Sequence, residues 1–129
     1  MFRDDCLKII GEERETKQAE EVITQLLTLS ERGNTITEQN VDYALSLTQE
    51  DRAGEIVELD KNVICHTVLG KPVKPKTIGQ QQYVQAMKDH MIVFGLGPAG
   101  TGKTYLAMAM AITAFKNNEV ERIILTRPA

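Results

Sequence analysis

The fold is decided by an eight-residue stretch, Gly97-Pro98-Ala99-Gly100-Thr101-Gly102-Lys103-Thr104. This stretch satisfies the spacing GxxxxGK[ST] of a Walker A loop, whose backbone N–H groups surround the phosphates of a nucleoside triphosphate. The spacing is informative only between a buried strand and a helix, and the sequence supplies both. Apolar residues 91–96 precede the loop, and the alanine- and methionine-rich segment 105–115 follows it. A glycine-rich turn that matched this spacing by chance would not also lie between a buried strand and a helix.

Each residue type in the loop has a physical task. Glycine at positions 97, 100 and 102 permits backbone conformations and close approaches that a Cβ atom would block. The positive end of the helix that begins near Lys103 adds to the field of the N–H groups. We expect Lys103 to reach the β- and γ-phosphates and the Thr104 hydroxyl to bind Mg²⁺. The loop therefore predicts binding of a nucleoside triphosphate with magnesium, but it does not specify the reaction.

Two apolar segments flank the helix that follows the loop. Residues 91–96 form a short continuous apolar run bounded by glycine, and residues 123–126 form another. Such runs are typical of fully buried parallel strands. Asn117 and Asn118 end the intervening helix. The sequence therefore predicts an α/β fold, with a β-α-β unit of the P-loop NTPase type at the start of a parallel sheet.

Residues 63–90 lead up to this unit. Residues 63–69 are apolar and β-branched enough for a strand, and Gly70 offers a turn. The prolines of residues 71–76 exclude a helix and favour extended backbone. The three lysines of that segment fit either a solvated loop or a contact with nucleic acid. Thr77 is placed to cap a helix that runs to about residue 90.

The first third of the chain predicts helices. Apolar residues between 19 and 27 recur with the spacing of one helical face, and Gly33-Asn34 end that helix. Thr37 is placed to cap a second helix that carries Ala44 and Thr48 on one face. We therefore divide the chain into three parts: a helical region at 1–50, a linker at 51–62, and the first part of a P-loop domain at 63–129.

Charge and composition restrict the compartment and the ligands. The 129 residues carry a net charge of −3, with −9 on residues 1–60 and +6 on residues 61–129. The basic part contains the loop, and this bias favours an anionic ligand. The two cysteines, Cys6 and Cys65, lack the spacing of a zinc site. No apolar stretch approaches the roughly 20 residues that span a bilayer, and the acidic N-terminus is unlike a signal peptide, so we expect a cytoplasmic protein.

The chain resembles the PhoH family of bacterial ATPases in five pieces of sequence: Pro75-Lys76-Thr77, Gly79-Gln80, Tyr83-Val84, GPAGTGKTYLA at 97–107, and Leu125-Thr126-Arg127-Pro128-Ala129. The resemblance covers residues 70–129, and most other Walker A proteins lack the PKTxGQ and LTRPA segments. It implies an ATP-binding core related to superfamily 1 helicases, with a role in RNA metabolism. The N-terminal third resembles the family's region before the ATPase, which is related to RNA-binding KH domains. Residues 7–11 would be a final KH-like strand, without a GxxG clamp.

The resemblance also implies roles for single residues. A glutamine upstream of the loop reads the adenine edge in such cores, and Gln80 stands in the matching place. Its neighbours in sequence, Gln81 and Gln82, are alternative registers for this role. ATP is then the expected nucleotide and Mg²⁺ its expected metal. Three basic residues are candidate RNA contacts: Lys74, Lys76 and Arg127. Arg127 would touch a backbone phosphate or pair with a carboxylate, and the sequence leaves both open.

The sequence leaves the catalytic residues unassigned. A P-loop ATPase needs an acidic residue on a later strand to hold Mg²⁺, and after Thr104 the only acidic residues are Glu119 and Glu121. We therefore expect the chain to be part of a larger ATPase, to be inactive by itself, and to associate with further copies as a homo-oligomer. Two other functions stay open: a P-loop kinase of small molecules, and a nucleotide- or RNA-binding module without catalysis.

Overall fold

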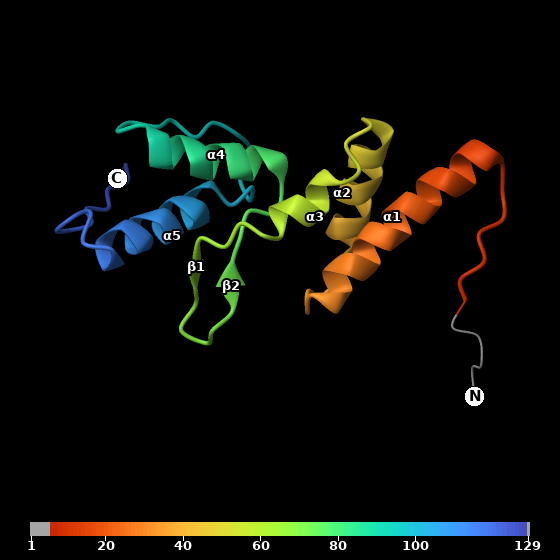
Figure 1. Ribbon diagram of the computed structural model, residues 1–129. Helices are drawn as coiled ribbons and strands as arrows, with labels where there is room; N and C mark the ends of the chain where they lie inside the picture. The colour runs from red at the N-terminus through yellow and green to blue at the C-terminus, as the bar shows by residue number, and fades with distance from the viewer. Residues whose placement is uncertain (1–5, 129) are drawn as a thin grey trace. The chain divides into compact units, whose positions relative to one another are not determined.

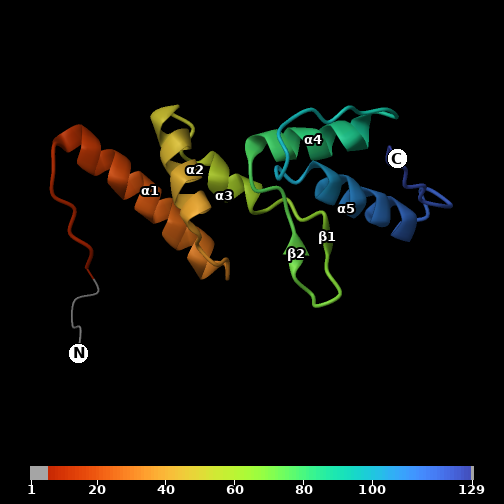
Figure 2. The same ribbon diagram turned by 180° about the vertical axis from the view of Figure 1, so that it is seen from behind.

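The computed structural model describes residues 6–128, and the chain separates into two compact units. The first unit extends to Glu58, and the second begins at Leu59. Figures 1 and 2 show the elements of both units from opposite sides. Ala129, the last residue of the LTRPA segment, lies outside the described residues. None of the described helices combines the length and the apolar character needed to cross a membrane.

The first unit is built on two long helices. Helices α1 (Glu13–Glu31) and α2 (Glu38–Gln49) pack against each other, and the short helix α3 (Glu55–Leu59) follows them. The core of the unit consists of buried apolar side chains: Val22, Leu29, Ala44, Leu47 and Ile56. Each long helix therefore buries one apolar face, and this packing rather than helix propensity alone stabilises the pair.

Both predicted boundaries between α1 and α2 are confirmed. Helix α1 ends in a Schellman motif, in which the N–H groups of Gly33 and Asn34 donate to carbonyls of the last turn at 2.9 and 3.2 Å. Gly33 has a φ of 83°, in the left-handed region that favours glycine. At the start of α2, the side-chain oxygen of Asn40 accepts a hydrogen bond from the Thr37 N–H at 2.9 Å. Local sequence signals thus set the turn between the helices.

Segment 51–62, which the sequence suggests as a linker, contains helix α3. The acidic residues of the segment obscure its helical pattern, but Ile56 and Leu59 are only 4% and 2% exposed. The Arg52 guanidinium donates to both carboxylate oxygens of Glu55, at 2.8 and 2.9 Å. This hydrogen bond raises the pKa of Arg52 above its ordinary value. Burial of apolar side chains explains why a helix forms in a segment with weak sequence signals.

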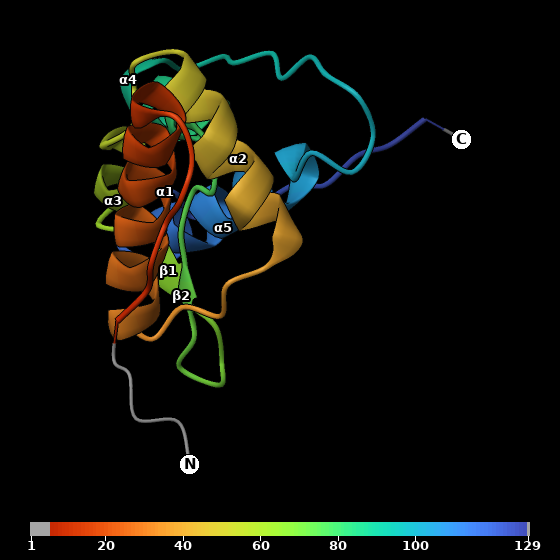
Figure 3. The same cartoon turned by 90° about the vertical axis from the view of Figure 1, so that its right-hand side faces the viewer.

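The second unit begins with a β-hairpin. Strands β1 (Cys65–His66) and β2 (Pro72–Val73) pair antiparallel, with Cys65 opposite Val73. Figures 1 and 3 show the connecting loop, which contains Gly70 with a φ of 76°. A strand and a turn therefore occur within the predicted segment, but the strand is two residues long instead of spanning 63–69.

Two helices complete the second unit. Helices α4 (Ile78–Asp89) and α5 (Lys103–Lys116) pack together, and α5 also contacts β1. Both confirm predicted helices: the Thr77 hydroxyl caps α4 by accepting a hydrogen bond from the Gln80 N–H at 3.2 Å, and Asn117 follows the last residue of α5. The core consists of buried apolar side chains from the hairpin and both helices: Val73, Val84, Leu106 and Ala109.

The predicted parallel strands are not formed among the described residues. Residues 91–96 and 123–126 are coil, and the sheet of this part of the chain is the antiparallel β1–β2 pair (Figure 3). Ile92 and Phe94 are 77% and 86% exposed. A fully apolar parallel strand forms between neighbouring strands and beneath helices, and no strand of residues 6–128 pairs with either segment. The apolar pattern is present without the sheet that it predicts.

The predicted KH-like strand is also not formed. Residues 7–11 are coil, with Leu7 and Ile10 exposed. Up to Glu58, the described residues form helices and no strand. A strand needs the backbone groups of a partner strand, and the described residues of that unit offer none to residues 7–11.

Candidate functional site

The loop of residues 97–104 lies between the coil of residues 91–96 and helix α5. Two of its glycines are in the left-handed region, Gly100 with a φ of 79° and Gly102 with a φ of 81°. Gly102 is also the N-cap of α5, so the loop passes directly into the first turn of this helix. The first N–H groups of an α-helix have no partner within the helix, and the dipole adds positive charge there. This end of α5 therefore favours an anion.

The ammonium group of Lys103 closes the loop. Its Nζ donates to the carbonyls of Gly97 at 2.8 Å and Pro98 at 2.5 Å, and to the Thr101 hydroxyl at 3.1 Å. The Thr101 hydroxyl in turn donates to the Pro98 carbonyl at 2.9 Å. A lysine at the end of the loop thus bonds to residues at its beginning, and its charge is held at the centre of the loop. Two of the three contacts are with backbone, so they do not depend on the side chains at those positions.

Thr104 follows Lys103 in the first turn of α5, and its side chain is exposed. A threonine hydroxyl in this position fits Mg²⁺, which takes one or two protein oxygens and completes its shell with phosphate and water. Elsewhere in the described residues, no three His, Cys, Asp or Glu side chains gather to hold a metal ion. Cys6 and Cys65 are both free thiols. The other hydroxyl of the loop, that of Thr101, already bonds to Pro98 and Lys103, so Thr104 is the candidate residue for magnesium.

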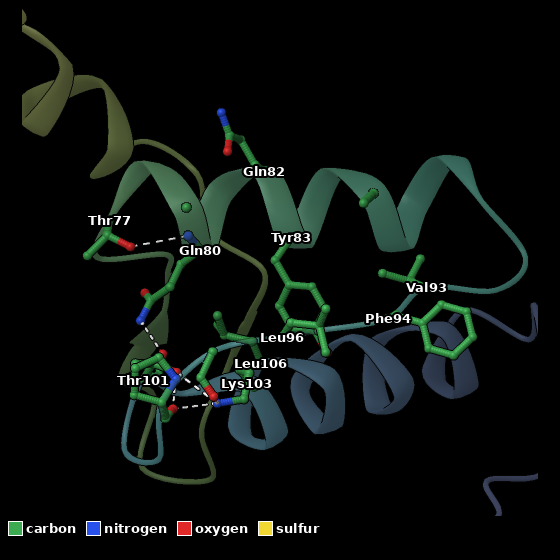
Figure 4. A pocket seen from close by; sticks show the side chains of 15 residues that line it. Thr77, Gln80, Gln82, Tyr83, Val93, Phe94, Leu96, Thr101, Lys103 and Leu106 are labelled. Carbon is green, nitrogen blue, oxygen red and sulfur yellow. Dashed lines mark hydrogen bonds between the residues drawn. The ribbon is translucent and has the colours of Figure 1, made fainter.

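A cavity of about 470 Å³ opens beside the loop. Helix α4 contributes Gln80 and Tyr83 to its wall, and the coil before the loop contributes Phe94 and Leu96. Figure 4 shows Gln80 pointing from α4 toward the loop and Tyr83 pointing toward Leu96, whereas Gln82 points to the other side of the helix. The cavity joins an apolar wall to the polar groups of the loop. Such a combination suits a ligand that has both a flat apolar part and a charged part.

Gln80 contacts the loop directly. Its Nε2 donates to the Thr101 carbonyl at 3.0 Å, and its Oε1 accepts a hydrogen bond from the Lys76 N–H at 2.7 Å. Both heavy atoms of the amide therefore have partners within the chain. The structure brings this predicted site residue together with the loop. No local sequence pattern signals this contact, because Gln80 and Thr101 are 21 residues apart.

Tyr83 has no role assigned from the sequence, but in the structure its ring makes a close contact beside the loop. The ring atoms of Tyr83 lie about 3.1 Å from the place that a Cβ atom on Gly95 would occupy. The ring therefore packs against the bare backbone of the coil that leads into the loop. An isolated glycine within an apolar run is the sequence signal for such a close approach.

The candidate RNA contacts differ in their surroundings. The Lys74 ammonium pairs with the Asp60 carboxylate, and its side chain is only 17% exposed. Lys76 and Arg127 are exposed. None of the three lines the cavity beside the loop. These three residues are therefore not part of the candidate site around the loop, and the charge of Lys74 is already balanced by Asp60.

Comparison with known proteins identifies the relatives of this chain. Residues 72–129 match the family model described as PhoH-like protein. The PhoH-like protein of Bacillus subtilis is 39% identical over 127 residues, which cover 98% of this chain and 40% of the relative. The PhoH-like protein of Mycobacterium tuberculosis is 40% identical over 130 residues, covering 98% of this chain and 36% of the relative. That of Synechocystis is 35% identical over 129 residues, covering all of this chain and 39% of the relative.

The chain spans about 40% of the length of these curated relatives. The similarity extends over both units of the structure, including the helices of the first. No solved structure matches the chain.

Proposed function

This chain belongs to the PhoH-like family, and from that premise we propose that the protein binds ATP with Mg²⁺ through the 97–104 loop and hydrolyses it in RNA metabolism. The observation that carries the proposal is the geometry of the loop. Two left-handed glycines, a lysine at the loop centre and the N-terminus of α5 converge there. Each of these features favours a bound polyphosphate. We propose the cytoplasm as the site of this activity.

Different groups of the loop bind the phosphates and the metal. The N–H groups at the start of α5 and the Lys103 ammonium face the negative charge of the phosphates. Lys103 reaches a phosphate by exchanging its longest contact, the 3.1 Å bond to the Thr101 hydroxyl, while it keeps its bonds to the two backbone carbonyls. The Thr104 hydroxyl is the protein group that would hold Mg²⁺ beside the phosphates. When bound, the metal neutralises charge that develops on the phosphates during hydrolysis.

The RNA part of the proposal rests on exposed positive charge. Lys76 precedes α4 and Arg127 lies near the end of the described chain, and both side chains are exposed. The second unit lies in the basic half of the sequence, which carries a net charge of +6 over residues 61–129. Exposed lysine and arginine bind phosphate backbones with little dependence on base sequence. We propose Lys76 and Arg127, in preference to Lys74, as the contacts.

Removal of the Lys103 ammonium tests the proposed function. In the full-length protein we expect Lys103→Ala to weaken the binding of MgATP by roughly 1.5–3 kcal/mol, the range for a hydrogen bond to a charged group. Lys116→Ala is the matched control, because it removes an exposed ammonium from the last residue of the same helix. Titration calorimetry gives the affinities, and circular dichroism verifies that both variants are folded. Equal affinity of the folded Lys103→Ala variant and the control would rule out this loop as the phosphate site.

A further inference from the structure

The amide of Gln80 joins the start of α4 to the 97–104 loop. It accepts a hydrogen bond from the Lys76 N–H just before α4 and donates one to the Thr101 carbonyl. Figure 4 shows the second bond running from the side chain down to the loop. The backbone of Gln80 is itself fixed, since its N–H donates to the Thr77 hydroxyl that caps the helix. The side chain therefore projects from a fixed helix start and reaches one particular peptide group.

The fit at this contact is close. A Cβ atom on Gly102 would lie 3.2 Å from the Gln80 Nε2, which is tighter than an ordinary contact. Gly102 has a φ of 81° and caps α5, so the contact falls where the loop turns into the helix. The amide thus lies directly against the turn from which the first N–H groups of α5 project.

The direction of the hydrogen bond has a consequence for the loop. In a planar trans peptide, the C=O and the N–H of the same unit point in opposite directions. Gln80 holds the carbonyl of the Thr101–Gly102 peptide toward α4. The N–H of Gly102 is therefore turned away from Gln80. An anion-binding loop works by aiming such N–H groups at one point, so fixing one peptide unit fixes one donor.

We infer that Gln80 is a positioning residue, which orients the Thr101–Gly102 peptide and so prepares the loop to bind phosphate. The inference rests on the proposed function, because it concerns the same site. It assigns to Gln80 an effect on every polyphosphate ligand, whether or not that ligand carries a base. Reading of the adenine edge, which the resemblance to superfamily 1 cores suggests, would instead act only on ligands that carry adenine.

A ligand without a base separates the two roles. The affinities of the full-length protein for MgATP, MgGTP and magnesium tripolyphosphate are measured by calorimetry in the wild type and in Gln80→Ala. We expect Gln80→Ala to weaken all three by a similar factor of roughly five, the effect of one net hydrogen bond. Gln85→Ala is the matched control, because Gln85 is an exposed glutamine of the same helix that does not line the cavity beside the loop. An unchanged tripolyphosphate affinity with a changed ratio of ATP to GTP affinity would overturn the inference in favour of base reading.

A second variant shows whether the donor to Thr101 is the important group. Gln80→Glu keeps an acceptor for the Lys76 N–H but places a carboxylate oxygen against the Thr101 carbonyl. At pH 7 we expect this variant to bind tripolyphosphate at least as weakly as Gln80→Ala. As the pH falls to about 4, near the ordinary pKa of glutamate, protonation restores a donor, so its affinity relative to wild type at the same pH should rise. A ratio that does not change with pH would contradict the inference, since a change that merely loosened the fold would give that result.

Lys103→Ala, measured with the same tripolyphosphate, keeps the two proposals distinguishable. If Lys103→Ala and the wild type bind this ligand equally, the proposed function fails. If Lys103→Ala weakens binding and Gln80→Ala does not, only the positioning role of Gln80 fails. Thermal unfolding without ligand accompanies each measurement, and we expect the midpoint of Gln80→Ala to stay near that of Gln85→Ala.

Discussion

At the scale of single residues, the second unit contains a close fit between Tyr83 and Gly95. The aromatic ring lies on a position where only a residue without a side chain leaves room. Tyr83 belongs to α4 and Gly95 to the coil before the loop, so the contact ties the helix to the segment that leads into the candidate site. Together with the amide of Gln80, this ring gives α4 two attachments to the region around the loop.

We predict that Gly95→Ala destabilises the second unit by roughly 1–3 kcal/mol, because the added methyl group overpacks the contact with the ring. The free energy of unfolding is measured by urea denaturation. In a Tyr83→Ala background the same substitution should cost much less, since the ring that it meets is gone. Equal effects of Gly95→Ala in the two backgrounds would show that the ring is not the cause.

The residue scale also shows what a sequence can and cannot predict about the site. The spacing of the loop predicted the position of Lys103 and the need for glycine at positions 100 and 102, where the structure has left-handed backbone. The contact between Gln80 and Thr101 could not be predicted from the sequence, because no local pattern relates residues 21 positions apart. Nor did the lysines of residues 71–76 reveal that Lys74 pairs with Asp60.

At the scale of elements, the ends of helices followed their local signals. Gly33, Thr37, Thr77 and Asn117 mark boundaries that the sequence predicted, because capping depends on neighbouring residues only. Helix α3 was missed because its formation depends on burial of Ile56 rather than on caps. The strands expected at 91–96 and 123–126 are not formed, for a related reason. A strand is stabilised by a partner, and partners are not a property of the segment itself.

We predict that Gly33→Ala destabilises the α1–α2 pair by about 1 kcal/mol, since alanine is strained at a φ of 83°. Hydrogen exchange of amides in α1 and α2 reports this change locally. Gly54→Ala is the control, because Gly54 has no positive φ and a Cβ atom there would meet nothing within 4 Å. A cost for Gly54→Ala as large as that for Gly33→Ala would refute the explanation from the left-handed C-cap.

At the scale of the molecule, exposed apolar residues gather in the two coils of the second unit. Residues 91–96 and 123–125 include Ile92, Phe94, Leu96, Ile124 and Leu125, all exposed. Exposed apolar side chains favour association, and extended segments offer unpaired backbone groups as well. The sequence pattern for buried strands is therefore present in segments that remain in water.

We predict that the 129-residue chain self-associates in a concentration-dependent manner. The double substitution Ile92→Lys with Phe94→Lys should reduce this association, because it places charge on the exposed coil. Sedimentation velocity over a range of protein concentrations measures the effect. Leu45→Lys is the control, since Leu45 is an exposed apolar residue of α2 in the first unit. A chain that sediments as a monomer at every concentration would contradict the prediction.

The approach of Gln80 to Gly102 also restricts how this protein can change over evolutionary time. A Cβ atom at position 102 would stand 3.2 Å from the amide nitrogen of residue 80, so this amide would have to shift by a few tenths of an ångström. A shorter residue at 80 would relieve the steric limit but would leave the Thr101 carbonyl without its donor. Substitutions at the two positions should therefore be epistatic, and a lineage that loses the glutamine would free position 102 only from crowding, since its φ of 81° would still disfavour other residues. In descendants of this sequence, glycine at position 102 should therefore be retained more often than glutamine at position 80.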